Sequence, residues 1–290
     1  MDINTPWLTS LLDSWLNEDL GRGDLTNYAL TDQNGSAHWI SKQSGIFCGG
    51  ALAVRLFKRL NSSVEVNLLI KDGEYFSTGQ KLLEIEGPTA TLAAVERTAL
   101  NLTMRLSGVA TATATLVKKL EGTKVRLADT RKTTPGLRVL EKYAFQCGGG
   151  INHRLGLDDA AMLKENHIAW AGGITSAIQA IRAGAPWPSK IIVEVEDPDQ
   201  AEEAVRAGAD GILLDEITPA VLNSLVPRLR ELASKRVCNK TDSQIILEAS
   251  GVDPMNLMAF AATGIDLIST SAPMTRSHWI DFSMRFNKAN

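Results

Sequence analysis

The sequence has few cysteines, no excess of basic residues and no long hydrophobic run. Cys48, Cys147 and Cys238 stand far apart without a CxxC or Cys/His spacing, which argues against a disulfide framework or a zinc site and fits a reducing cytoplasm. Lysine and arginine number 30 against 33 aspartate and glutamate residues, so the broad basic field of a nucleic-acid binder is missing. The acidic amino terminus predicts neither a signal peptide nor a membrane span. We therefore expect a cytoplasmic protein without nucleic-acid or membrane partners.

The composition is that of an ordinary folded protein. Of 290 residues, 44% are hydrophobic and 22% are charged, which lies outside the disordered and fibrous classes. Domains have about 150 residues each as a rule, so the length suits one large domain or two moderate ones.

The first part of the chain predicts an α+β domain. Apolar residues from Trp7 to Leu16 recur at helical spacing, and the segment 35–87 consists of short apolar runs between glycine-containing turns. Residues 71–87 resemble the strand pairs of lipoyl and biotin carriers, but the modifiable lysine motif of those carriers is missing, which favours a structural hairpin. From about residue 90 to 120, the pattern predicts long helices that link two domains.

After residue 120, short β-rich segments alternate with helical ones. This rhythm is typical of a parallel sheet with crossover helices. Neither GxGxxG nor GxxxxGK[ST] follows a strand, which argues against a dinucleotide or NTPase site. Five or six units are evident instead of eight, so we predict an incomplete TIM-like α/β barrel.

Polar residues stand where these predicted strands end. Reactive groups of parallel barrels gather at the carboxyl ends of the strands. One such residue alone is better explained as a cap or a surface charge, but five strands ending this way favour an active site. The strand-end residues are Asp129, Thr130, Arg131, Lys132, Glu194, Glu196, Asp215, Glu216, Ser250, Gly251, Ser269, Thr270 and Ser271.

A second concentration of charge lies between residues 126 and 154, where six basic residues stand against two acidic ones. It predicts a local site for a polyanionic small molecule. Arg138 and Lys142 are explained equally well by a solvated helical face, whereas Arg131 and Lys132 stand directly at a strand end. The glycines at 148–150, just before His153 and Arg154, allow the backbone to approach a ligand closely.

Several runs in this sequence together resemble the quinolinate phosphoribosyltransferase family. They are EDLGRGDLT, ERTALNLTMRLSGVATAT, ADTRKTTPGLR, CGGGINHR, VEVED, ADGILLDE and LEASG, and the resemblance extends from about residue 18 to 285. It implies an N-terminal α+β sandwich domain (1–112), an open α/β barrel (113–270) and a C-terminal segment (271–290) that returns to the first domain. It also implies a homodimer, or a higher oligomer, in which the sandwich domain of one subunit caps the barrel of the other.

The implied reaction transfers the phosphoribosyl group of 5-phosphoribosyl 1-pyrophosphate to quinolinate. Pyrophosphate and carbon dioxide leave, and nicotinate mononucleotide is formed for NAD biosynthesis. By the same resemblance, Arg131 and Arg154 bind quinolinate, and Arg97 is supplied across the dimer interface. Guanidinium forks suit the two adjacent carboxylates of quinolinate. Further substrate-binding positions that match the family are Lys132, His153 and Lys164.

Glu194 and Asp215 match acidic positions of the family. They are expected to bind the ribose hydroxyls and Mg²⁺, directly or through water or pyrophosphate, with Glu196 as a less favoured substitute. Together with Lys132 they form the expected catalytic set. Lys132, His153 or solvent could donate the proton after decarboxylation, and the sequence does not choose among them.

The late barrel loops depart from the family pattern. Valine follows Ser250-Gly251 where a second glycine is common, and residues 270–276 replace a Val-Gly-Ala-Leu-Thr-His run. These loops are still expected to bind the 5′-phosphate through backbone N–H groups. The expected phosphate-binding residues are Ser250, Gly251, Ser271 and Ala272.

Two other functions remain open at this point. A phosphoribosyltransferase acting on nicotinate or another ring acid without decarboxylation would not need all three of Arg97, Arg131 and Arg154. A non-catalytic paralogue that binds a phosphorylated metabolite would leave Glu194 and Asp215 without a task.

Overall fold

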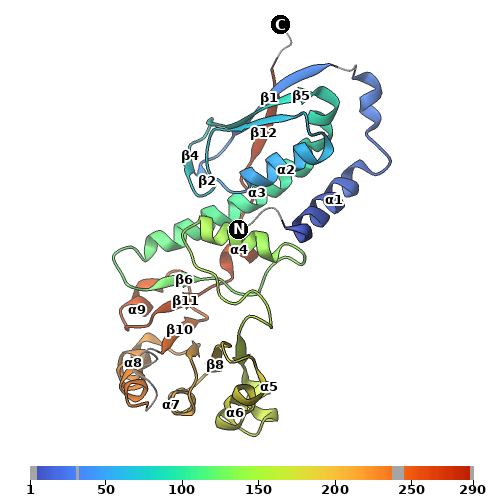
Figure 1. Ribbon diagram of the computed structural model, residues 1–290. Coiled ribbons are helices and arrows are strands. Elements are labelled where there is room, and N and C mark those ends of the chain that lie inside the picture. Colours follow the sequence, from blue (N-terminus) through green and yellow to red (C-terminus); the bar gives the residue numbers. More distant parts are fainter. Residues whose placement is uncertain (1–4, 31–32, 237–244, 288–290) are drawn as a thin grey trace. The chain divides into compact units, whose positions relative to one another are not determined.

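The computed structural model describes residues 5–30, 33–236 and 245–287 (Figure 1). The chain divides into two compact units, each with its own sheets. Unit 1 consists of Met1–Ala114, Val139–Gly149 and Ala272–Asn290, and unit 2 consists of Thr115–Arg138 and Gly150–Ser271. None of the helices in the described ranges combines the length and hydrophobicity needed to cross a bilayer.

Unit 1 is built on a four-stranded antiparallel sheet with the order β12-β1-β5-β3 (Figure 1). Trp39 of the first strand pairs with Met284 of the last, so the C-terminal segment completes the sheet of this unit. The strands of unit 1 are β1 (Asn34–Ser41), β3 (Glu65–Leu68), β5 (Lys81–Pro88) and β12 (Phe282–Phe286), with a separate pair, β2 (Gly45–Ile46) and β4 (Tyr75–Phe76).

Alternation of side chains fixes which face of this sheet is buried. In β1, Ala37, Trp39 and Ser41 are buried while the residues between them are partly exposed, as a period of two requires. Trp39 meets Phe57 edge to face, with 6.4 Å between the ring centroids. The sheet and the helix that carries Phe57 therefore share one core.

The helices of unit 1 follow from caps and apolar stripes. The first one begins after Thr5, whose side chain accepts a hydrogen bond from the Leu8 backbone, and its stripe includes the buried Leu12 and Leu16, which confirms the helix predicted there. The region 90–120 is one continuous helix. The helices are α1 (Pro6–Leu20), the 3₁₀ helix η1 (Leu25–Ala29), α2 (Gly50–Leu60), α3 (Thr89–Lys119), α4 (Arg138–Cys147) and α10 (Ala272–Arg276).

Unit 2 contains a six-stranded parallel sheet with the order β6-β11-β10-β9-β8-β7. In β9 (Gly211–Asp215) the consecutive residues Ile212, Leu213 and Leu214 are all buried. Such uninterrupted burial is typical of a parallel sheet that is covered on both faces. The strands are β6 (Arg126–Ala128), β7 (Ala161–Leu163), β8 (Ile191–Val195), β9 (Gly211–Asp215), β10 (Ile246–Ser250) and β11 (Leu267–Ser269).

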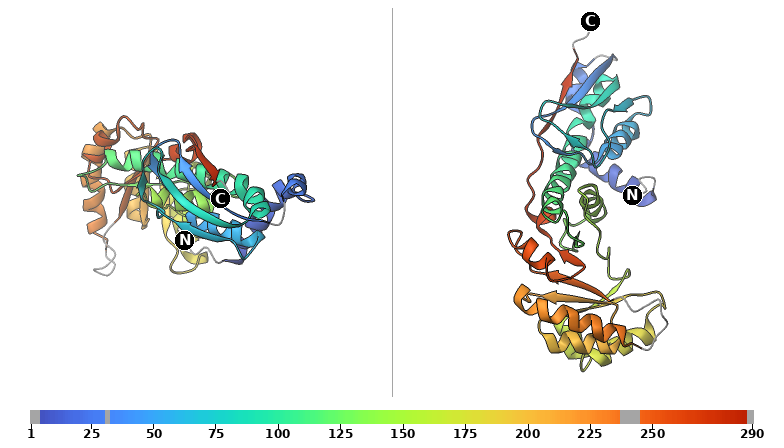
Figure 2. Two further views of the ribbon diagram at one scale, coloured as in Figure 1. Left: turned by 90° about the horizontal axis from the view of Figure 1, so that it is seen from above. Right: turned by 90° about the vertical axis from the view of Figure 1, so that its left-hand side faces the viewer.

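Helices alternate with these strands, as the sequence predicts. They are α5 (Glu165–Trp170), α6 (Ile174–Gly184), α7 (Pro198–Ala207), α8 (Pro219–Ser234) and α9 (Leu257–Ala261). Neighbouring members α6, α7 and α8 lie side by side (Figures 1 and 2). Local signals limit the length of these helices, as α7 shows. Asp197 caps its first turn, and Gly208 ends it in the left-handed region, at φ 95°.

The strand order is that of an open barrel. From β7 to β11 spatial order follows chain order, and β6 pairs with β11. Between β6 and β7 the described residues form no ladder, and a single parallel bridge joins Ala128 to Ile151. The expectation of an incomplete α/β barrel after an N-terminal sheet domain is therefore confirmed.

One segment from the middle of the chain belongs to unit 1. The segment Val139–Gly149 lies within the predicted barrel range but belongs to unit 1. Two contacts explain this assignment: the buried Glu141 carboxylate accepts a hydrogen bond from Arg105 Nη2 of α3 at 2.6 Å, and the Tyr143 hydroxyl donates to Asp72 Oδ2 at 2.8 Å.

Candidate active site at the carboxyl ends of the barrel strands

The carboxyl edge of the parallel sheet in unit 2 brings the predicted polar residues together. Lys164 follows β7, Glu194 lies near the end of β8, and Asp215 and Ser250 are the last residues of β9 and β10. Asp215 and Ser250 are direct register partners. All four side chains therefore belong to one edge of one sheet, where parallel α/β proteins place their reactive groups.

These four side chains form two pairs. The Lys164 ammonium forms an ion pair with Glu194 Oε2, and the Ser250 hydroxyl donates to Asp215 Oδ1. Both carboxylates are half-buried, whereas Lys164 is exposed. Two carboxylates on adjacent strands with a hydroxyl beside them are hard oxygen donors, so this group fits a Mg²⁺ ion as well as sugar hydroxyls.

His153 is held on three sides. Its backbone N–H donates to Asp129 Oδ1 at 2.8 Å, its Nδ1 accepts from the Arg154 backbone at 2.7 Å, and its Nε2 lies 3.2 Å from Glu248 Oε2. Because Nδ1 accepts, the ring proton is on Nε2 and points to Glu248. Asp129 and Glu248 are both buried.

Arg131 and Arg154 form the cationic part of the site. The Arg154 guanidinium donates to the Ala160 carbonyl at 2.9 Å. Burial and the positive charge of Arg131 lower the pKa of Arg154, while Asp159 and Glu194 act in the opposite direction. The buried Nη1 of Arg131 has no hydrogen-bond partner within the described part of the chain. Two neighbouring guanidinium groups, one with an unsatisfied buried donor, have the charge and the hydrogen-bonding capacity that an anion requires.

The backbone of the loop after β9 is strained directly after Asp215. Glu216 adopts a φ of 54°, which a residue other than glycine rarely does. Gly251 faces it across the strand ends, with a φ of 71°, and a Cβ added there would lie 3.3 Å from Glu216 Cγ and 3.7 Å from Asp215 Oδ1. The glycine at 251 thus leaves room for the backbone to come close to Asp215.

The remaining predicted residues lie around this cluster or in the other unit. Lys132 is exposed directly after Arg131, Glu196 is exposed just beyond β8, and Ser271 is half-buried after β11. Ala272 begins α10 and belongs to unit 1. Arg97 also belongs to unit 1, where it is exposed on α3, so it is not one of the side chains that unit 2 brings together.

A cavity of about 960 Å³ in unit 2 adjoins the histidine. His153, Arg154 and Glu248 line it, and it extends to Lys190 and Asp210, which precede β8 and β9. Of the predicted site residues, His153 and Arg154 therefore face a cavity whose lining reaches the amino ends of β8 to β11 and does not include Glu194 or Asp215.

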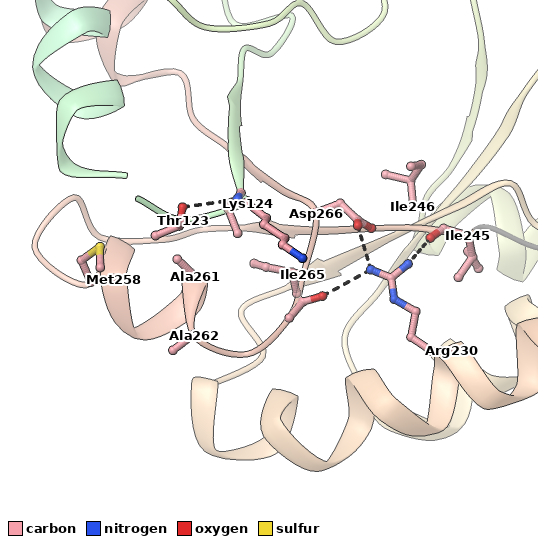
Figure 3. Close-up of a pocket in the computed structure, with 12 residues that line it drawn as sticks. Thr123, Lys124, Arg230, Ile245, Ile246, Met258, Ala261, Ala262, Ile265 and Asp266 are labelled. Atoms are coloured by element: carbon pink, nitrogen blue, oxygen red, sulfur yellow. Dashed lines mark hydrogen bonds and ion pairs between the residues drawn. The ribbon is translucent and has the colours of Figure 1, made fainter. Parts of the chain in front are cut away.

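A second hollow, of about 630 Å³, lies at the amino ends of β6, β10 and β11 (Figure 3). Its arginine, Arg230, donates to Asp266 Oδ1 at 2.8 Å and to the Gly264 carbonyl at 3.3 Å. Because this charge is already paired and the strands point their polar ends away from it, this hollow is not the candidate active site.

Comparison with known proteins identifies the family. Residues 24–107 match the domain described as quinolinate phosphoribosyl transferase, N-terminal domain, and residues 109–285 match the corresponding C-terminal domain. The chain belongs to the quinolinate phosphoribosyl transferase family. The resemblance drawn from the sequence motifs is thereby confirmed.

Relatives of this family cover nearly the whole chain. A probable nicotinate-nucleotide pyrophosphorylase [carboxylating] of Synechocystis sp. is 43% identical over 97% of this chain and 91% of its own length. The Bacillus subtilis protein of that name is 39% identical, over 98% and 94% respectively. The solved nicotinate-nucleotide pyrophosphorylase of Francisella tularensis has a TM-score of 0.89 and 34% identity, covering 97% of this chain and 96% of that one.

One residue of this site, Glu248, was missed by sequence reasoning. Glu248 stands inside the quoted run LEASG, yet only the residues after it were singled out. The available signal was a carboxylate in the middle of an otherwise apolar strand, Ile246–Ser250. Such a charge needs a partner when buried, and His153 is that partner.

Proposed function

We propose that this chain transfers the phosphoribosyl group of 5-phosphoribosyl 1-pyrophosphate to quinolinate and releases pyrophosphate and carbon dioxide. The product is nicotinate mononucleotide, which leads to NAD. Membership of the quinolinate phosphoribosyl transferase family supports the reaction. The single structural observation that supports the substrate is the Arg131 and Arg154 pair, with its unsatisfied buried donor.

Quinolinate matches this pair in charge and shape. Its two adjacent carboxylates offer four oxygens in one plane, and each guanidinium can bind a carboxylate through two parallel hydrogen bonds. A dianion would satisfy Arg131 Nη1 and offset the burial and the repulsion from Arg131 that together lower the pKa of Arg154. The side chains of Lys132 and Lys164, together with His153, would add positive potential around the dianion.

Glu194 and Asp215 would serve the other substrate. We assign them to the ribose hydroxyls and to Mg²⁺, which would bind directly or through water or pyrophosphate. When bound, the ion would supply charge neutralisation for the departing pyrophosphate. The two carboxylates themselves favour the positive charge that develops on the anomeric carbon as the C–O bond breaks.

Decarboxylation needs little from the protein. Once the ring nitrogen carries the ribose, its positive charge accepts the electron pair left at ring carbon 2. The side chains then hold the ring in place and screen its charge. Lys132 and His153 are the titratable groups nearest the quinolinate arginines in sequence, and solvent is the third proton source.

The 5′-phosphate is assigned to the loops after β10 and β11. Gly251 has no side chain to block its backbone N–H, and Ser250, Ser271 and Ala272 add donors near the same strand ends. The valine at position 252 is buried, so the family's second glycine is replaced by a core residue and not by a competing polar group.

We also propose a cytoplasmic homodimer with shared sites. Arg97 would reach the quinolinate site of the partner subunit, which explains why an exposed arginine of unit 1 matches a substrate-binding position. A higher oligomer can be built from the same dimer.

The substrate is tested by offering the enzyme two ring acids. Purified protein is incubated with 5-phosphoribosyl 1-pyrophosphate, Mg²⁺ and either quinolinate or nicotinate, and nicotinate mononucleotide is followed by mass spectrometry. We expect product from quinolinate alone. Product from nicotinate would instead favour the non-decarboxylating transferase, and binding without turnover would favour the phosphometabolite-binding paralogue.

A further inference from the structure

Two thiols that the proposed reaction does not use lie together in unit 1. Cys48 precedes α2, and Cys147 is the last residue of α4. Their sulfur atoms and a carboxylate oxygen of Asp72 all lie within 4.8 Å of one another. Cys48 is buried and Cys147 is half-buried, so the pair has one sheltered and one accessible member.

The same helix holds both cysteines in place. The Cys48 backbone N–H donates to Ser107 Oγ of α3 at 3.0 Å, and the same hydroxyl donates back to the Cys48 carbonyl at 3.3 Å. Gly148, which follows Cys147, packs closely against α3, since a Cβ added to this glycine would lie 2.6 Å from Thr113 Cβ. The distance between the thiols is therefore set by contacts on both sides and not by loose loops.

The neighbouring carboxylate is already occupied. Asp72 Oδ1 accepts hydrogen bonds from the backbones of Gly49 and Gly50 at 3.0 and 2.9 Å, where α2 begins. Asp72 Oδ2 accepts from the Tyr143 hydroxyl at 2.8 Å. Within the described ranges this leaves two thiols as the available soft donors, whereas a structural zinc site uses four ligands. Thiol chemistry suits the cluster better than a metal ion.

The surroundings make the two thiols unequal. The neighbouring Cys48 thiol lowers the pKa of Cys147, partial burial raises it, the Tyr143 hydroxyl lowers it and the charge of Asp72 raises it, and the net effect is a lowered pKa. Burial raises the pKa of Cys48. Cys147 is therefore the member that becomes a thiolate, and thiolates are the nucleophiles of cysteine chemistry.

We propose that Cys48 and Cys147 are a dithiol pair that closes to an intramolecular disulfide when the protein meets a hydroperoxide. The Cys147 thiolate attacks the terminal peroxide oxygen, the O–O bond breaks, and the alkoxide or hydroxide leaves with the proton that Cys147 released. Cys48 then attacks the sulfur of the resulting sulfenic acid, and its own proton leaves with the hydroxyl group as water. Two electrons pass from the two thiols to the peroxide.

The test uses the full chain with Cys238→Ser, in which these two thiols are the only ones. After treatment with one equivalent of hydrogen peroxide, we expect an intact mass lower by two hydrogens and a loss of both free thiols. A non-reducing peptide map should join the peptides of Cys48 and Cys147, and dithiothreitol should restore both thiols. Added oxygen on Cys147 without this link, a disulfide between chains, or no reaction while free cysteine is oxidised would each overturn the proposal.

Variants separate the roles of the two thiols. With Cys48→Ser, Cys147 should gain oxygen and be trapped by a sulfenic-acid reagent, whereas with Cys147→Ser, Cys48 should stay unmodified. With Tyr143→Phe, the rate of disulfide formation near neutral pH should fall about threefold to tenfold, because the thiolate fraction follows the pKa. Tyr28→Phe is the matched control, since Tyr28 is 92% exposed, and its rate should not change.

Discussion

His153 Nε2 lies 3.2 Å from Glu248 Oε2, and both side chains are almost completely buried. This pair fixes the ring of a histidine whose neighbour, Arg154, is assigned to quinolinate. Glu248 does not match any substrate position in the sequence motifs, so its contribution would be to position His153 and the chain that follows it.

The first prediction concerns this positioning residue. Glu248→Ala should lower the free energy of unfolding by about 1–3 kcal/mol, because it leaves a buried donor unsatisfied. It should also lower kcat/KM for quinolinate about tenfold, which is about 1.4 kcal/mol of transition-state binding. Glu248→Gln keeps an acceptor and should retain most of the stability and most of the kcat/KM for quinolinate. If Glu248 only filled space, Glu248→Met would retain them equally well. Urea denaturation and steady-state kinetics measure the two effects.

The second prediction concerns the quinolinate arginines. Arg131→Lys should lower kcat/KM for quinolinate about 30-fold or more, because a lysine cannot replace the fork that binds a carboxylate through two hydrogen bonds. The KM for 5-phosphoribosyl 1-pyrophosphate should change little. Arg126→Lys is the matched control, since Arg126 is exposed at the start of β6. An unchanged kcat/KM for quinolinate in Arg131→Lys would remove the basis for the substrate assignment.

The third prediction separates the acidic strand ends. Glu194→Gln and Asp215→Asn should each lower kcat by about 100-fold to 1,000-fold, because each removes charge stabilisation of the transition state. Glu196→Gln should be close to wild type, since Glu196 is exposed just beyond the end of β8. Titration of activity with Mg²⁺ in each variant would show a raised metal requirement for the first two. Loss of activity in Glu196→Gln alone would reassign the role to that residue.

The fourth prediction tests shared sites. Arg97→Ala and Lys164→Ala proteins should each be nearly inactive as pure dimers. Mixed and re-dimerised in equal amounts, they should recover about one quarter of wild-type activity, because half of the dimers are mixed and each mixed dimer has one intact site of two. If mixing restores nothing although mass spectrometry shows mixed dimers, each site is built from one chain.

The fifth prediction concerns the contact that assigns α4 to unit 1. The Glu141 carboxylate is buried and pairs with Arg105, whose Nη1 also donates to Ser277 Oγ at 3.0 Å. Arg105→Ala should lower the free energy of unfolding by about 3–5 kcal/mol, because it removes the guanidinium partner of a buried carboxylate. Lys235→Ala removes an exposed ion pair with Glu231 and should leave the urea midpoint unchanged. Equal midpoints for the two variants would contradict the importance of the buried pair.

The sequence predicted those parts of the fold that local patterns determine. The apolar stripe of α1 and the alternation of strands and helices after residue 120 depend on short-range periodicity, and both appear in the structure. The position of the barrel opening was not predictable from pattern alone. It depends on which strand ladders form, and among the described residues β6 and β7 form no ladder with each other.

The site shows the same division. Residues at the ends of apolar strands, such as Glu194 and Asp215, could be found because parallel strands bring their carboxyl ends together, whereas Lys164 was found only through the resemblance to the family. Glu248 could not, because its partner His153 is far away in the sequence and the pairing is visible only in three dimensions. The proximity of Cys48 and Cys147 was hidden for the same reason, since Cys48 and Gly148, which follows Cys147, each contact α3 and neither spacing nor composition shows that.

The most direct test of the account follows the carbon that must be lost. Wild-type enzyme is given quinolinate labelled in the 2-carboxylate, 5-phosphoribosyl 1-pyrophosphate and Mg²⁺, and labelled carbon dioxide and pyrophosphate are measured over time. The account predicts that the two appear in a one-to-one ratio, together with nicotinate mononucleotide. Pyrophosphate released without labelled carbon dioxide, or neither product, would contradict it.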